Sequence, residues 1–124
     1  MKILLAFEKE YRAYTTAIAD AIRMFRSDVE VALADSRELE AEVERFDPQM
    51  VICSSPIPSN PVAPQIVGFI ELSPEPDQLS KFRLGQHSWE STNPTLGEIL
   101  PAVDETKRLY RTSHEQELTE TNET

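Results

Sequence analysis

The sequence has few glycine and cysteine residues, and each shortage excludes a class of site. Of 124 residues, three are glycine (Gly68, Gly85 and Gly97) and one is cysteine (Cys53). No glycine-rich turn follows the first apolar segment, so neither a dinucleotide-binding fingerprint nor a phosphate-binding P-loop is present. A single cysteine excludes an intrachain disulfide and a thiolate metal site.

Basic residues are also in short supply. Lys and Arg total 12 against 22 Asp and Glu, which gives a formal net charge of −10. This charge opposes binding to nucleic acid and docking on an anionic membrane surface. No apolar run approaches the roughly 20 residues of a membrane span, and the apolar residues 1–7 are too short for a signal peptide. We therefore expect a soluble, cytoplasmic protein with no nucleic-acid or membrane partner.

The first half of the chain alternates strand patterns with helical patterns. Residues 3–7, 29–33 and 50–53 are short apolar runs, typical of strands that are buried on both faces. Apolar residues at spacings of three and four predict a helix over residues 11–25, and a second, short helix opens with a capping box at 35–38. This β-α-β-α-β order with short links predicts a parallel sheet.

The second half has a different character. Four prolines predict an extended loop over residues 55–64, followed by a fourth strand at 65–72 and a half-exposed edge strand at 81–84. The last two strands can lie parallel or, because their connection is short, form an antiparallel hairpin. A final helix from residue 96 carries one apolar stripe, with Pro101 off the stripe.

Together these patterns predict an α/β fold with a three-layer, doubly wound sheet. The third and fourth helices of such a fold are expected to be shortened or lost, because the second half leaves little room for them. Residues 1–112 are expected to form one domain, since a chain of this length supports a single core. Residues 113–124 are polar and acidic, and we expect a disordered tail there.

The segment from Pro48 to Ser54 resembles the phosphoacceptor motif of response-regulator receiver domains. Receivers commonly carry Pro-Asp, four apolar residues and then the phosphorylated Asp. Here Pro48-Gln49 precedes four apolar residues, and Ser54 stands at the phosphoacceptor position. With the β-α-β-α-β start, the resemblance covers residues 1–55 well and 92–111 loosely. It implies a flavodoxin-like fold and a role in signal transduction.

The resemblance also implies where catalytic groups should stand, and this chain lacks them. The receiver's acidic pair, which holds Mg²⁺, falls on Phe7 and Glu8, and the position of its conserved lysine holds Gln86 and His87. One carboxylate is a weak Mg²⁺ site. The Ser54 hydroxyl is a far weaker nucleophile than a carboxylate unless a base activates it. We therefore expect no aspartyl-phosphate chemistry, no metal and no cofactor.

Our leading hypothesis is a non-catalytic, phosphorylation-independent receiver-like module that binds another protein. Its binding surface would be the last strand and the last helix, as in receivers. Apolar residues left exposed there would support homodimerisation or docking of a partner whose identity the sequence does not give. The residues expected on this surface are Phe82, Leu84, Val103 and Tyr110.

The second hypothesis is a small-molecule or anion-binding protein, or a small hydrolase-type enzyme. It would use a crevice at the ends of the first and third strands, with His87 as a base for Cys53 or Ser54. We favour the non-catalytic hypothesis, because a cysteine that closes an apolar strand is typical of a core. Trp89 either caps the core or contacts a ligand. The predicted pocket residues are Phe7, Glu8, Cys53, Ser54, Ser55 and His87.

Overall fold

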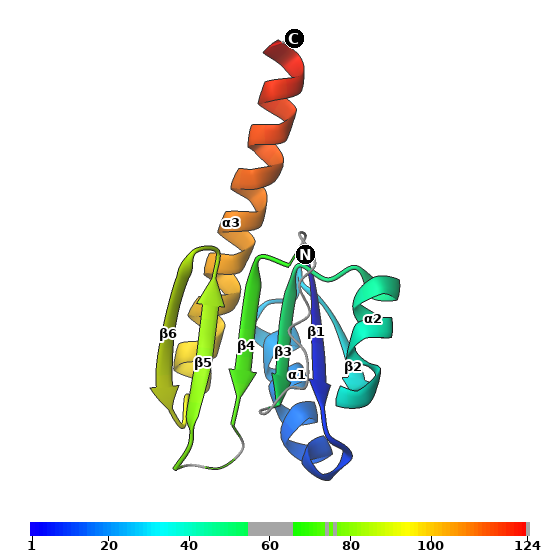
Figure 1. Cartoon of the computed structure of the whole chain (residues 1–124), viewed down its shortest axis with the longest axis vertical. Helices are drawn as coiled ribbons and strands as arrows, with labels where there is room; N and C mark the ends of the chain where they lie inside the picture. Colours follow the sequence, from blue (N-terminus) through cyan, green and yellow to red (C-terminus); the bar gives the residue numbers. More distant parts are fainter. Residues whose placement is uncertain (55–65, 74, 76, 124) are drawn as a thin grey trace.

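The protein is built on one six-stranded sheet with three helices (Figure 1). The computed structural model describes residues 1–54, 66–73, 75 and 77–123, with side chains as far as residue 112. The strands are β1 (Lys2–Phe7), β2 (Glu30–Asp35), β3 (Met50–Ser54), β4 (Gly68–Leu72), β5 (Leu79–Leu84) and β6 (His87–Thr92). The helices are α1 (Arg12–Phe25), α2 (Leu39–Phe46) and α3 (Leu96–Glu123), and the 3-10 turns are η1 (Lys9–Tyr11) and η2 (Ser36–Glu38).

The first four strands confirm the predicted doubly wound, parallel half of the fold. The spatial order is β2-β1-β3-β4-β5-β6, and β1, β2, β3 and β4 all run in the same direction. The chain leaves β1 toward β2 on one side and returns to β3 on the other. This reversal places a topological switch point at the carboxyl ends of β1 and β3, where open α/β sheets bind ligands.

The last two strands form an antiparallel extension of the sheet. β5 runs antiparallel to β4, as the short connection allows, and β6 runs antiparallel to β5. A two-residue turn joins β5 to β6, with Gly85 at a φ of +60°, as a type II′ turn requires. The sequence does not predict β6, because five of its six residues are exposed and no apolar alternation marks the strand.

The helices cover the sheet in two layers, as the predicted three-layer architecture requires. α1 and α3 pack on one face over a core of apolar residues from β1, β3, β4 and β5. α2 packs on the other face over a smaller cluster that includes Leu4, Val51, Cys53 and Phe69. α3 continues beyond the end of the sheet (Figure 1). The division of the chain at residue 112 stays a prediction.

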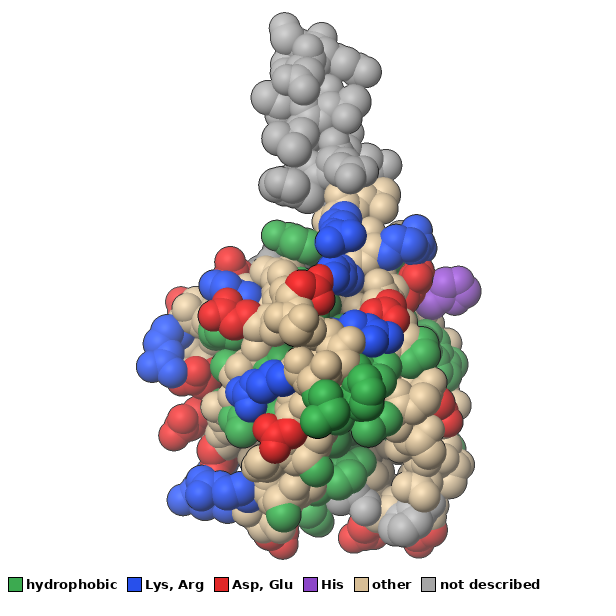
Figure 2. All heavy atoms as spheres, turned by 180° about the vertical axis from the view of Figure 1, so that it is seen from behind, with side chains coloured by type: hydrophobic (Ala, Val, Ile, Leu, Met, Phe, Trp, Pro, Cys, Tyr) green, Lys and Arg blue, Asp and Glu red, His purple; other side chains and the backbone are tan. Residues whose placement is uncertain are grey.

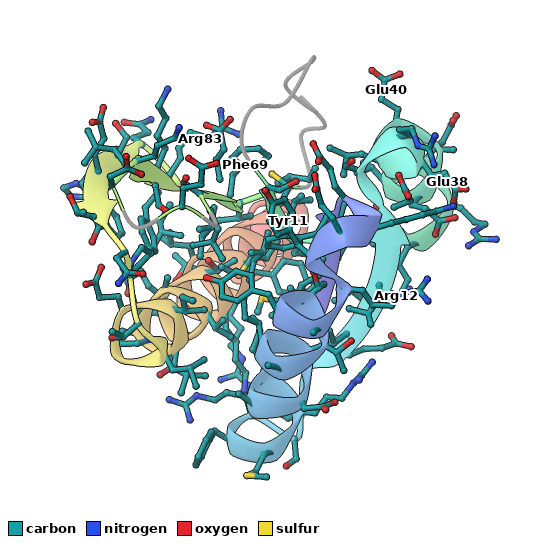
Figure 3. The ribbon with its side chains drawn as sticks, turned by 90° about the horizontal axis from the view of Figure 1, so that it is seen from below. Tyr11, Arg12, Glu38, Glu40, Phe69 and Arg83 are labelled. Carbon is teal, nitrogen blue, oxygen red and sulfur yellow. The ribbon has the colours of Figure 1, made fainter. Side chains whose placement is uncertain are left out.

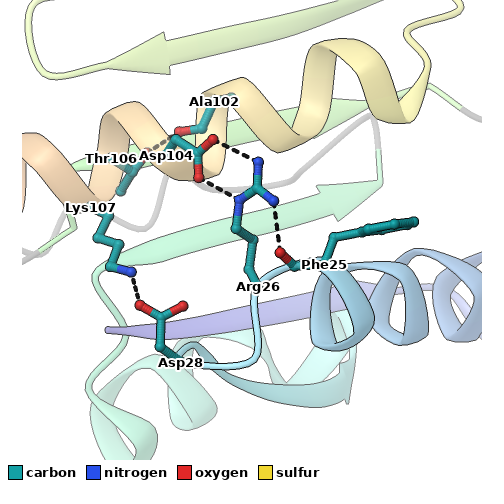
Figure 4. A network of polar contacts seen from close by, with 7 residues as sticks. All are labelled: Phe25, Arg26, Asp28, Ala102, Asp104, Thr106 and Lys107. Atoms are coloured by element: carbon teal, nitrogen blue, oxygen red, sulfur yellow. Dashed lines mark hydrogen bonds and ion pairs between the residues drawn. The ribbon is translucent and has the colours of Figure 1, made fainter.

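Ion pairs join the segment that follows α1 to α3 (Figure 4). The Arg26 guanidinium donates to both carboxylate oxygens of Asp104, at 2.5 and 2.8 Å. Lys107 forms a second ion pair with Asp28. Because these side chains are partly exposed, each pair is worth at most about 1 kcal/mol. The pairs therefore orient the two helices, while the buried apolar core supplies most of the stability.

α3 crosses β4 at a point where no side chain fits. A Cβ atom on Gly68 would lie 2.2 Å from the Oγ1 atom of Thr106. Thr106 is fully buried, and its hydroxyl donates to the carbonyl of Ala102 at 2.8 Å. The absence of a side chain at Gly68 therefore sets how closely the helix can approach the sheet. Within the described residues, no helix is both long enough and apolar enough to cross a membrane.

Replacing Gly68 by alanine is expected to destabilise the fold, because the new methyl group meets a fully buried side chain. The expected loss is about 1–3 kcal/mol, the usual cost of overpacking a core. Thermal and urea denaturation followed by circular dichroism measure it. Gly97→Ala is the matched control, since a Cβ atom there would lie 3.3 Å from the Oγ1 atom of Thr95. Equal stability of the two variants would contradict this close contact.

Candidate functional site

The carboxyl ends of β1, β2 and β3 meet at one edge of the sheet. The register pairs Phe7 with Asp35, and Ala6 with Cys53, which precedes Ser54. Asp35, Phe7 and Ser54 therefore follow one another across this edge. Figure 3 views the molecule from this end, with Tyr11 near the centre.

Ser54 is buried at this edge without a polar partner. Its side chain is 3% exposed, and its Oγ atom has no hydrogen-bond partner among the described residues. Alternation along β3 places it on the same face as Met50 and Ile52, which belong to the core under α1 and α3. No described base therefore activates this hydroxyl. Ser55 lies outside the described residues.

Cys53 faces the opposite side of the sheet and belongs to the core beneath α2. Its side chain is 1% exposed, and the thiol donates to the carbonyl of Ile70 at 3.5 Å. Burial, together with the nearby carboxylate of Glu71, raises the pKa of the Cys53 thiol far above its ordinary value. Since the thiolate is the nucleophilic form, this cysteine is held in its unreactive state.

Two acidic residues at this edge, Glu8 and Asp35, have different surroundings: Glu8 lies near other carboxylates, and Asp35 is paired with Arg37. A hydrogen bond with Glu10 raises the pKa of Glu8, and desolvation and the charges of Glu10 and Asp35 raise it further. Asp35 accepts hydrogen bonds from the backbone N–H of Arg37 at 2.9 Å and from its guanidinium at 3.2 Å, which lower the pKa of Asp35. In the described part of the chain, no three His, Cys, Asp or Glu residues are grouped so that they could hold a metal ion.

A cavity of about 450 Å³ lies between α1 and β2 beside this edge. Of the six predicted pocket residues, only Phe7 and Glu8 line it. The Oδ2 atom of Asp35 is buried beside it and has no described hydrogen-bond partner. Sequence reasoning did not identify Asp35 as a site residue, although its position at the end of a strand is a usable signal. The lining residues carry charges of both signs: Phe7, Glu8, Lys9, Arg12, Thr15, Thr16, Leu33, Ala34, Asp35 and Glu38.

The structure corrects the placement of His87 in the predicted pocket. β5 runs antiparallel, so its last residue, Leu84, pairs with Gly68 at the beginning of β4 and with His87. His87 therefore lies at the amino end of the parallel strands, with β4 and β5 between it and β3. From this position it cannot act as a base for Cys53 or Ser54.

The structure also corrects the predicted interaction surface. Phe82, Leu84 and Val103 are 1%, 5% and 0% exposed, because alternation along β5 directs Phe82 and Leu84 under α3, where Val103 also packs. These three side chains belong to the core. Tyr110 is half-buried on α3.

The aromatic side chain that does reach this surface is Trp89. It stacks on Phe82, with ring centroids 5.0 Å apart and an interplanar angle of 10°, and remains 42% exposed. Beside it, a cavity of about 310 Å³ separates β6 from α3, and we call it the β6–α3 groove. The same face of the molecule carries several hydrophobic patches between charged side chains (Figure 2). The groove is lined by Leu84, Gln86, His87, Trp89, Glu98, Pro101, Ala102, Glu105, Arg108 and Leu109.

The burial of Cys53 predicts that the native protein resists alkylation at neutral pH. We expect iodoacetamide to modify the thiol only after unfolding, because the thiolate is disfavoured and enclosed. Intact-mass spectrometry, with and without guanidinium chloride, measures this. A Leu33→Cys variant in a Cys53→Ala background is the control for accessibility, since Leu33 is 44% exposed. Rapid alkylation of native Cys53 would contradict its placement in the core.

Comparison with protein-family models, curated proteins and solved structures finds no match to this chain. The resemblance to receiver domains therefore stays a prediction from the residues. The fold and the chemistry of its two surfaces, the carboxyl edge and the β6–α3 groove, are what remain to indicate a function.

Proposed function

We propose that this chain is a non-catalytic, receiver-like module that binds another protein chain and does not depend on phosphorylation. The observation that carries the proposal is the burial of Ser54 at the phosphoacceptor position. A neutral hydroxyl stands there, on a residue that is 3% exposed, and its oxygen has no hydrogen-bond partner among the described residues. Phosphoryl transfer depends on positioning and on charge stabilisation, and this position provides neither.

The charged residues nearby do not compensate. Mg²⁺ needs oxygen ligands, usually carboxylates with full negative charge. Glu10 raises the pKa of Glu8, and one oxygen of Asp35, Oδ1, accepts hydrogen bonds from Arg37. Among the described residues, no third His, Cys, Asp or Glu lies close enough to these two carboxylates to complete a metal site.

The β6–α3 groove supports a binding role instead. Partly exposed aromatic side chains beside an apolar groove are typical anchors of protein interfaces. Trp89 has this position, and Pro101 and Leu109 add apolar surface from α3. The polar rim, with Glu98, Arg108 and others, matches the usual arrangement of an interface.

A second candidate function is the binding of a small polar molecule in the cavity between α1 and β2. The buried, unpartnered Oδ2 atom of Asp35 favours it, since a ligand N–H or O–H group could donate to this oxygen. The Asp35→Asn variant is expected to bind such a ligand more weakly than the wild type does. This candidate concerns a different surface and does not exclude protein binding.

Incubation with Mg²⁺ and acetyl phosphate is expected to leave the protein unmodified, because Ser54 is neither exposed nor activated. Intact-mass spectrometry measures any added phosphoryl group. Ser54→Ala is the matched control. Stoichiometric phosphorylation of the wild type but not of Ser54→Ala would overturn the proposal. Phosphorylation of both proteins would place the phosphate on another residue and would not contradict the proposal.

A further inference from the structure

We propose that β6 pairs antiparallel with β6 of a second copy of this chain, so that the two sheets join into one. This inference rests on the proposed function and names the partner. β6 is the last strand in the sheet order, and no described strand lies on its outer side. An exposed edge strand presents unpaired backbone groups that another strand can bind. The outermost strand at one side of the sheet in Figure 1 is β6.

The turn between β5 and β6 determines which backbone groups face outward. A two-residue turn is closed by hydrogen bonds between the residues on either side of it, here Leu84 and His87. Because hydrogen-bonded pairs alternate along an antiparallel ladder, we expect Ser88, Glu90 and Thr92 to direct their N–H and C=O groups toward the open edge. These groups form the pairing surface for the second copy.

In a symmetric dimer, a residue at the middle of β6 stands opposite the same residue of the partner, and two choices of that residue are considered. If both α3 helices lie on the same face of the joined sheet, residues of the same side-chain face must stand opposite each other. Either Trp89 faces the partner's Trp89, or Glu90 faces the partner's Glu90. The second register sets two carboxylates directly opposite and is destabilised. The first forms an aromatic pair and sets Glu90 opposite the partner's Ser88.

The polar side chains on either side of Trp89 are compatible with the same register. With Trp89 at the centre, His87 stands opposite the partner's Ser91. The Ser91 hydroxyl donates to the Glu98 carboxylate at 2.6 Å, so an imidazole faces a carboxylate-bound hydroxyl twice in the dimer. In this register the partner's Trp89 also shields each exposed Trp89 ring from solvent, beside the β6–α3 groove.

The net charge of −10 on each copy opposes this association. Salt screens the repulsion between copies, so the dimer is expected to become tighter as ionic strength rises. An interface made mainly by one strand from each copy is small, and small interfaces are weak. A basic protein partner would show the opposite dependence on salt.

Analytical ultracentrifugation of the full chain, from about 1 µM to about 1 mM, tests the proposal over the range of weak affinities. We expect the mass to rise from 14.1 kDa toward twice that value. Trp89→Thr is expected to weaken association about tenfold or more, the effect of losing about 1.4 kcal/mol of aromatic contact. Leu33→Thr, on the exposed edge strand β2, is the matched control and should not change it.

Cysteine cross-linking tests the register. In a Cys53→Ala background, Trp89→Cys is expected to form an intermolecular disulfide, since facing residues of a non-hydrogen-bonded pair lie about 4.5 Å apart. Glu90→Cys is the control, because its counterpart is diagonal. Cross-linking through Glu90→Cys alone would overturn the register.

A monomer at every concentration, or association unaffected by Trp89→Thr, would overturn the proposal. Trp89→Tyr keeps an aromatic ring and should retain the dimer, which separates a lost contact from a damaged fold. Phosphorylation at Ser54 would overturn the proposed function without affecting this test, so the two failures are distinguishable.

Discussion

The reversal of chain direction between β4 and β5 is the constraint on which the rest of the structure depends. Residues 73–78 connect the two strands, and the connection is held by a hydrogen bond from the backbone N–H of Ser73 to the Oγ of fully buried Ser80, at 2.9 Å. A link this short cannot carry the chain back for a parallel strand, which needs a crossover of a dozen or more residues. β5 must therefore run antiparallel, and β6 follows it to the edge of the sheet.

This reversal separates the groups that a catalytic site would need. In a fully parallel sheet, the residues after β5 would lie at the carboxyl edge, the same edge as Ser54. Here the turn after β5 lies at the amino end, and His87 lies there with it. The carboxyl edge keeps a buried hydroxyl and carboxylates that are repelled or already paired, while the reversal exposes β6 and Trp89 at the opposite side of the molecule. The reversal therefore accounts both for the separation of His87 from Ser54 and for the position of β6 at the edge of the sheet.

The sequence allows the parallel half of the fold to be predicted because β1 and β3 are buried on both faces and read as continuous apolar runs. β6 could not be predicted, since a mostly exposed strand has no hydrophobic period. The sequence is compatible with either direction of β5, and the position of His87 depends on that direction. The apolar stripe of α3 predicted a helix with one buried face, but did not show that Val103 would meet Phe82 and Leu84 in the core.

Cross-strand nuclear Overhauser effects in the isotopically labelled chain test the reversal most directly. The antiparallel arrangement predicts contacts that pair Gly68 with Leu84 and Phe69 with Arg83 across β4 and β5, and Phe82 with Trp89 across β5 and β6. Contacts that instead pair Leu72 with Leu84 would make β5 parallel to β4. That result would place His87 at the carboxyl edge, the same edge as Ser54, and contradict the account.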